Sequence, residues 1–205
     1  MGAAAAPTLY ANRLLAALAA FLLAVGIGAH ALDELHGRPL QTRLSNAALI
    51  ALATASLAGA VAIGIAGIVT VSAWLIPLVV AGPILAVAYN LELFGGRLHD
   101  DMWFALAWGG FPAFTGYFVN ALQVRPAGLL TAAACCLLSA AQRRLSTPVR
   151  DLRRRTAELG GTQVMRSGER RPVDADSVAG PLEGALRALW LAMVLLAIGL
   201  TAVRL

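Results

Sequence analysis

LSNAALIALATASLAGAVAIGIAGIVTVSAWLIPLVVAGPILAVAYNL occupies residues 44–91 and contains no charged side chain. One membrane helix needs only about 20 apolar residues, so this segment is long enough for two. A weak interruption lies at Gly67–Thr70, where small and β-branched residues meet. The segment therefore predicts two membrane helices joined by a tight turn.

The composition of the whole chain agrees with a membrane protein. Of its 205 residues, 59% are hydrophobic and 13% are charged, against roughly a quarter charged in soluble domains. The mean hydropathy is +0.74. We expect an all-α, polytopic integral membrane bundle that forms a single membrane domain over residues 1–205. About six spans are expected, at Arg13–Leu32, Ala47–Val69, Val71–Leu91, Trp103–Leu122, Ala127–Gln142 and Leu182–Val203.

Arginine placement predicts the topology. Residues 143–181 carry nine arginines and should form a basic cytoplasmic loop by the positive-inside rule. Residues 149–159 could form a short interfacial helix within it, and residues 163–180 are expected to be flexible. Alternation along the chain then places two polar clusters on the cytoplasmic side as well. We expect the plasma membrane of a prokaryote, contact with membrane lipid, and no nucleic-acid partner, because no aromatic residues are interleaved with the arginines.

The first polar cluster follows the first span. His30, Asp33 and Glu34 are spaced to share one face of a helix end, and His36 and Arg38 follow in a turn before a proline. Carboxylates suit Mg²⁺ and arginine suits phosphate. The alternative is that these side chains only solvate the helix end and pair with one another.

The second cluster follows the third span. Tyr89 and Asn90 lie nearest the membrane, where an unpaired polar group is costly, and Glu92, Arg97 and His99 come after them. Arg97 could bind an anion or merely follow the positive-inside rule. The next residues, Asp100 and Asp101, could instead cap the following helix. That helix carries aromatic residues and a proline at 103–117, which suits either a kinked core helix or an aromatic wall for a lipidic tail.

Histidine and carboxylate residues occur together in both clusters. Such mixed ligands favour Zn²⁺, Mn²⁺ or Fe over Mg²⁺. A transition-metal site is therefore a second hypothesis, and its candidate ligands are His30, Asp33, Glu34, His36, Glu92 and His99.

The order of these motifs resembles the UbiA superfamily of intramembrane prenyltransferases. The matching strings are Asp33 to Leu40, Arg43 to Ser45, Tyr89–Asn90 with Arg97, and Gly109 to Tyr117. Gly37 stands where that family carries a second aspartate. The family's later aspartate motif is represented here by a single acid, Asp151, among arginines.

The resemblance implies a UbiA-like bundle that binds an isoprenoid diphosphate through Mg²⁺ and transfers the prenyl group to an aromatic or lipid acceptor. Asp33, Glu34 and Arg38 would be catalytic, with Asp33 the first metal ligand. Arg38, Tyr89, Asn90, Arg97 and Tyr117 would bind substrate. The alternatives are a transition-metal enzyme and a non-catalytic scaffold, and a homo-oligomer could enclose a long prenyl chain.

Overall fold

The structure is a computed structural model that describes residues 1–204. It is helical apart from one small hairpin and connecting segments. The helices are α1 (Ala11–Phe21), α2 (His30–Gly37), α3 (Asn46–Thr70), α4 (Ile76–Asn90), α5 (Asp101–Ala105), α6 (Phe111–Ala121), α7 (Pro126–Arg150) and α8 (Ala175–Ala202). The strands are β1 (Gly161–Val164) and β2 (Arg170–Val173), which pair antiparallel.

Several of these helices join into longer rods. A π-helical stretch at Leu22–Ala29 links α1 to α2, and another at Leu106–Gly110 links α5 to α6. A third, Asp151–Arg155, extends α7. Pro112 follows the second stretch, and the helix continues through it. Local π-helical turns of this kind absorb backbone irregularity without ending a helix.

Four helical segments are long and apolar enough to cross a membrane, which indicates an integral membrane protein. They are Ala11–Gly37, Asn46–Thr70, Ala73–Asn90 and Ala175–Ala202. The predicted break near Gly67–Thr70 is confirmed, because α3 ends at Thr70. The Ser72 hydroxyl oxygen accepts a hydrogen bond from the backbone N–H of Trp74 and caps the helical turn that follows. The expected pair of helices in residues 44–91 is therefore present.

The prediction for the basic loop was wrong in its local structure. The expected helix over residues 149–159 does not begin as a separate element: α7 continues through Pro148 to Arg150, and the hydroxyls of Ser146 and Thr147 donate to the carbonyl of Arg143. Residues 163–180 were expected to be flexible, but they hold the hairpin and the start of α8. That helix begins early because Asp174 and Ser177 form a capping box, which satisfies free N–H groups of its first turn.

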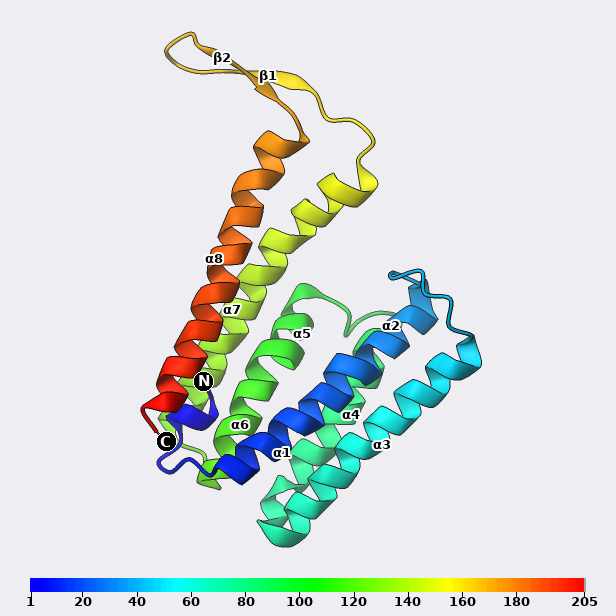
Figure 1. The fold of residues 1–205 in the computed structure, drawn as a ribbon, viewed down its shortest axis with the longest axis vertical. Helices are drawn as coiled ribbons and strands as arrows, with labels where there is room; N and C mark the ends of the chain where they lie inside the picture. Colours follow the sequence, from blue (N-terminus) through cyan, green and yellow to red (C-terminus); the bar gives the residue numbers. More distant parts are fainter. Residues whose placement is uncertain (205) are drawn as a thin grey trace.

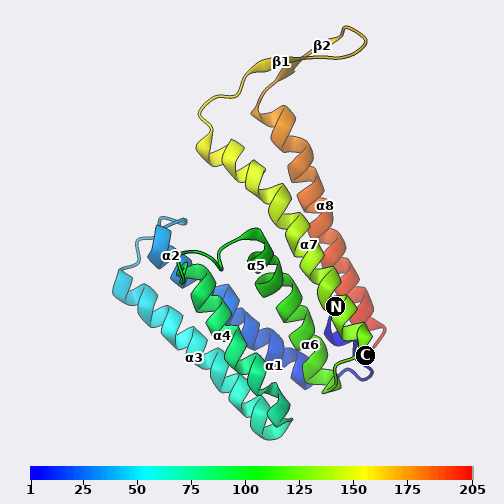
Figure 2. The same cartoon turned by 180° about the vertical axis from the view of Figure 1, so that it is seen from behind.

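The helix ends that carry the polar clusters lie together. In Figures 1 and 2 the α2–α3 loop, the α4–α5 connection and the hairpin beyond α7 and α8 point toward the same end of the molecule. The two chain termini lie toward the other end. Close packing fixes the cluster end of α2, where Ala31 and Leu32 contact Leu49 and Ala53 of α3 in a buried core. The expectation that both clusters and the basic segment share one end is met.

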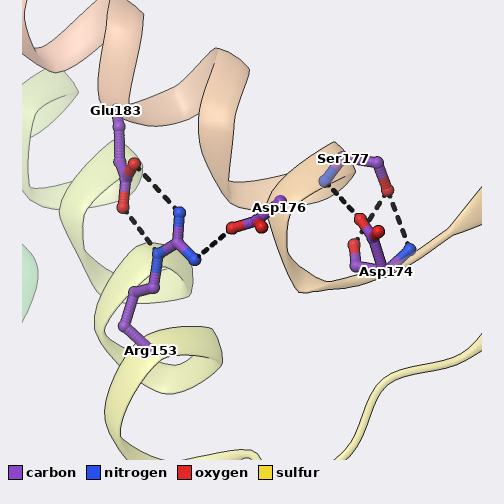
Figure 3. A network of polar contacts seen from close by, with 5 residues as sticks. All are labelled: Arg153, Asp174, Asp176, Ser177 and Glu183. Carbon is purple, nitrogen blue, oxygen red and sulfur yellow. Dashed lines mark hydrogen bonds and ion pairs between the residues drawn. The ribbon is translucent and has the colours of Figure 1, made fainter.

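Arg153 ties the tops of α7 and α8 together. Its guanidinium donates to both carboxylate oxygens of Glu183, at 2.8 and 3.1 Å, and to Asp176 at 2.6 Å. Figure 3 shows this fork beside the Asp174–Ser177 cap. Both carboxylates stabilise the charged guanidinium and raise the pKa of Arg153 above its usual range. The pair α7 and α8 therefore forms one arm that carries the hairpin.

Candidate functional site

Glu34 of the first cluster is used by its own loop. The side chain is 1% exposed, and its carboxylate accepts three hydrogen bonds, from the N–H of Leu40 at 2.9 Å, the N–H of Thr42 at 2.7 Å and the hydroxyl of Thr42 at 2.9 Å. A buried carboxylate needs such donors to offset its lost hydration. Glu34 therefore holds the α2–α3 loop in place.

Arg38 has a similar role on the same loop. Its backbone is left-handed, with φ of 50°, and closes α2. Its guanidinium donates to the carbonyls of Thr42 at 3.3 Å and Leu44 at 2.8 Å, and to the side-chain oxygen of Asn46 at the start of α3. The UbiA resemblance implied that Asp33, Glu34 and Arg38 are catalytic. Glu34 and Arg38 instead hold the α2–α3 loop through hydrogen bonds, and within residues 1–204 only Asp33 of the three makes no hydrogen bond to it.

Tyr89 of the second cluster is buried without a partner. The residue is 6% exposed, and its ring lies among aromatic side chains. His99 stacks on it at 4.4 Å, Trp108 meets it edge-on at 5.6 Å and Phe104 lies at 6.1 Å between ring centroids. Within the described residues its hydroxyl makes no hydrogen bond. Such an unsatisfied group is costly and calls for an explanation, often a ligand or an ordered water.

Charged residues of α2, α5 and α7 come near Tyr89. Asp33, Asp101, Arg143 and Arg150 all lie close enough to act on it electrostatically. We call these four residues and Tyr89 the Tyr89 centre. Arg143 is fixed there, since its Nε donates to Asp101 at 3.0 Å and its guanidinium lies 4.9 Å from the centroid of the Phe104 ring. In the part of the chain that is described, neither Nη group of Arg143 has a hydrogen-bond partner.

Glu92 connects the two clusters. Its carboxylate oxygens lie 3.7 Å from His36 Nε2 and 3.9 Å from His99 Nε2. His99 Nδ1 lies 2.9 Å from the carbonyl of Tyr89. The histidine and carboxylate residues of the transition-metal hypothesis are therefore brought together in part, although within residues 1–204 no group of three or more histidine, cysteine, aspartate or glutamate side chains could hold a metal ion as the side chains stand.

The other expected residues lie elsewhere or have local partners. His30 Nδ1 contacts the carbonyl of Val25, and Asn90 donates to the carbonyl of Ala86 at 2.7 Å. Arg97 is exposed on the α4–α5 connection. Tyr117 is fully buried, and its ring packs so tightly on Gly128 of α7 that a β-carbon there would lie 2.3 Å from it. Asp100 caps α5 by accepting the N–H of Trp103, which is one of the two roles expected for it.

Two cavities lie beneath the Tyr89 centre, toward the far end of the bundle. The first, of about 330 Å³, lies among α1, α3, α4 and α6, and Ala86 and Trp108 line it. Ala86 is one turn before Tyr89. The second, of about 680 Å³, lies among α1, α6, α7 and α8, and Phe104 and Trp108 line it. Both are lined mainly by apolar side chains, and Trp108 belongs to both.

Sequence reasoning missed the role of Arg143 and Arg150. Both were counted only among the nine arginines of the basic loop at residues 143–181. The available signal for Arg143 was its position, since α7 and α4 end on the same side of the bundle in the expected topology. The contact with Asp101 depends on how α5 packs on α7, which spacing along the chain does not reveal.

Comparison with protein-family models, curated proteins and solved structures found no match to this chain.

The residues present fit Mg²⁺ poorly. Mg²⁺ prefers oxygen ligands, usually one or two carboxylates with substrate phosphates. Glu34 is saturated by the loop, and Asp101 is paired with Arg143. Only Asp33 is left near Tyr89, where two arginines already supply positive charge. We therefore derive no reaction step through a bound metal.

Proposed function

We propose that this is a UbiA-like membrane protein that binds an isoprenoid diphosphate at the Tyr89 centre. In this proposal all six helical rods cross the plasma membrane of a prokaryote, and the centre faces the cytoplasm. The diphosphate lies against Tyr89, Arg143 and Arg150, and the hydrocarbon tail enters the first cavity.

The observation that carries the proposal is the buried hydroxyl of Tyr89, which has no partner in the described structure and lies within electrostatic range of two arginines. A phosphate oxygen would accept a hydrogen bond from this hydroxyl and would fill the place of the missing partner. The free Nη groups of Arg143 suit the same anion, because guanidinium binds phosphate through paired N–H groups. One anionic group thus satisfies both residues.

The first cavity supplies a place for the tail. Its lining on α4 extends from Leu78 to Ala86, a height of about 12 Å at 1.5 Å per residue. Its volume of about 330 Å³ lies at the lower end of the range for ligand pockets, roughly 300–1,000 Å³. A branched apolar chain attached to a charged head matches this succession of a polar centre and an apolar cavity.

The second cavity favours a protein that transfers the prenyl group to an acceptor over one that only binds the isoprenoid diphosphate. It shares Trp108 with the first cavity and reaches Phe104 below Arg143. An aromatic or lipid acceptor there would meet the prenyl carbon beneath the Tyr89 centre. In the reaction the bond from prenyl carbon to diphosphate oxygen breaks, and its electron pair leaves with diphosphate held by the arginines. The acceptor then bonds to the allylic cation and releases a proton. The faces of Trp108 and Phe104 can stabilise that cation.

The test is thermal stabilisation of the detergent-purified protein by the non-hydrolysable thiolo analogue of geranylgeranyl diphosphate. We expect a dose-dependent rise in Tm for the wild type. In Arg143→Gln the affinity for the analogue should fall about 10-fold or more, because a charge-assisted hydrogen bond is lost. The matched control is Arg144→Gln, which removes the same charge from the neighbouring, exposed residue and should bind as wild type.

The experiment is run with and without Mg²⁺ and repeated with Asp33→Asn. A shift that needs Mg²⁺ and is lost in Asp33→Asn would assign the metal to Asp33, whereas a shift independent of Mg²⁺ would show that the arginines suffice. No shift in any condition, or an equal loss in Arg144→Gln, would contradict the proposed site. Geranylgeranyl diphosphate itself, incubated with candidate aromatic acceptors, then tests turnover.

A further inference from the structure

We infer that His36, Glu92 and His99 form a binding site for a divalent transition-metal ion of the zinc class, which joins the end of α2 to the α4–α5 connection. The inference does not rest on the isoprenoid site: His99 stacks on Tyr89, but His36 and Glu92 lie outside the Tyr89 centre. It rests on the geometry of the three side chains and on the hydrogen bond that orients one of them.

The carboxylate of Glu92 stands between two imidazole nitrogens. The Nε2 atom of His36 lies 3.7 Å from one of its oxygens, and Nε2 of His99 lies 3.9 Å from the other. Ligand atoms around tetrahedral zinc, with bonds of 2.0–2.1 Å, are about 3.3 Å apart. A contraction of a few tenths of an ångström would bring each histidine to that separation from the carboxylate. His36 and Glu92 can move this far by side-chain rotation, because their side chains are 46% and 44% exposed, while His99 stays in place.

The tautomer of His99 strengthens the argument. A carbonyl oxygen can only accept a hydrogen bond, so Nδ1 of His99 must carry the proton that it donates to the carbonyl of Tyr89 at 2.9 Å. In the neutral imidazole, Nε2 then presents a lone pair toward the Glu92 carboxylate. A cation between these two groups removes the repulsion of their lone pairs: a metal ion does so for the neutral ring, and a proton on Nε2 does so in the imidazolium form. Metal-bound histidines are commonly fixed by a hydrogen bond of this kind from the other ring nitrogen.

The backbone holds Glu92 in an unusual conformation. Its φ is +49°, which an L-residue other than glycine, asparagine or aspartate rarely adopts. The turn is secured by hydrogen bonds from Glu92 N–H to the Tyr89 carbonyl and from Gly96 N–H to the Glu92 carbonyl. Strain of this kind clusters at ligand sites, and here it places the carboxylate between the two rings.

Two histidines and one carboxylate are the ligand set of many zinc sites with one open position. The ion would link residues far apart in sequence, and its fourth position would hold water. His30 is excluded, since it lies nearly two turns before His36 and its Nδ1 contacts the Val25 carbonyl. Glu34 is excluded because three hydrogen bonds already saturate its carboxylate.

The test is metal binding by the full-length protein in detergent after chelator treatment. We expect about one Zn²⁺ per chain after dialysis, and a visible absorption band of tetrahedral Co²⁺ when cobalt replaces zinc. His36→Ala, His99→Ala and Glu92→Gln should each weaken Zn²⁺ binding by at least about 10- to 100-fold. The matched control, His30→Ala, also loses one histidine and should bind as wild type.

Wild-type protein that retains no zinc and shows no cobalt band would overturn the site, as would an equal loss of zinc in His30→Ala, which would show adventitious binding by surface histidines. Circular dichroism of each variant checks that it is folded, and the conservative Glu92→Gln keeps the test valid if an alanine variant is unstable. His36→Ala should still bind the geranylgeranyl analogue, so failure of the metal site and failure of the isoprenoid site are distinguishable.

Discussion

Glu34 and Tyr89 are both buried polar side chains at the same end of the bundle, yet they differ in what surrounds them. Glu34 accepts three hydrogen bonds from its own loop, whereas the Tyr89 hydroxyl has no partner in residues 1–204 and lies within electrostatic range of charged side chains on α2, α5 and α7. Saturation of Glu34 indicates a structural role, whereas the unmet hydrogen bond of Tyr89, like those of Thr115 and Tyr117, has no such explanation within the described residues. The comparison shows that an acidic motif near a membrane surface is not by itself a site.

The largest expected effect is on stability, from Glu34→Gln. The substitution replaces one acceptor oxygen by an NH₂ group, which then faces a backbone N–H of the loop, and a buried donor loses its partner. We expect the Tm to fall by roughly 5–10 °C, measured by thermal unfolding in detergent.

Asp33→Asn is the control for Glu34→Gln, since Asp33 is the preceding residue and makes no hydrogen bond in the described structure. It should leave the Tm nearly unchanged. An equal fall in Tm in the two variants would mean that stability depends on the negative charge at the end of α2 and not on the hydrogen bonds from the loop to Glu34. Faster proteolysis within residues 38–45 in Glu34→Gln alone would locate the damage at the loop.

Tyr89→Phe should weaken ligand binding without lowering the Tm, in contrast to Glu34→Gln. Removing an unsatisfied buried hydroxyl relieves a desolvation cost, so the Tm should stay level or rise by roughly 2 °C. Affinity for the geranylgeranyl analogue should fall about 10-fold, as expected for one lost hydrogen bond. A lower Tm with unchanged analogue binding would assign Tyr89 to the core.

The smallest effect is expected at the exposed cap of α8, where neither burial nor a ligand is involved. Hydrogen bonds from the backbone N–H and the hydroxyl of Ser177 lower the pKa of Asp174. A carboxyl whose folded pKa is depressed stabilises the folded state above its unfolded pKa, about 3.9. That contribution is lost as the pH falls through the folded value.

Hydrogen exchange at amides of the first turn of α8 measures this effect at pH 7 and near pH 3. Wild type should lose protection at the lower pH, and Asp174→Asn should show little dependence on pH. The same dependence in both proteins would mean that another group controls the end of the helix.

The helices were predictable because their signal is local. Residues 44–91 gave two helices and the break between them, and arginine placement predicted that both clusters share one end. The hairpin was not predicted, although the dipeptide Ser167–Gly168 is a turn signal in the sequence. In the structure Gly168 adopts a φ of +85° at this turn. The start of α8 at Asp174 was also missed, although Asp and Ser three residues apart favour a helix cap.

The roles of individual site residues could not be predicted from spacing. Glu34 and Asp33 are adjacent and chemically alike, and only the folded loop shows that one is saturated while the other is not. The approach of Arg143 to Asp101 and the cavities on either side of Trp108 arise from the packing of helices distant in sequence. The distinction between a ligand site and a loop anchor therefore exists only in three dimensions.

The length of α8 has a consequence for the membrane itself. Arg187 and Arg204 bracket its apolar part, about 26 Å apart at 1.5 Å per residue, and Arg204 is held by the carbonyl of Ala4 at 3.1 Å. An average hydrocarbon core is thicker, at about 30 Å. An apolar segment this short thins the surrounding lipid locally or draws its flanking arginines toward the interface, whereas the uncharged 25 residues of α3 are long enough for an average bilayer, so the bilayer around α8 should be thinner than that around α3.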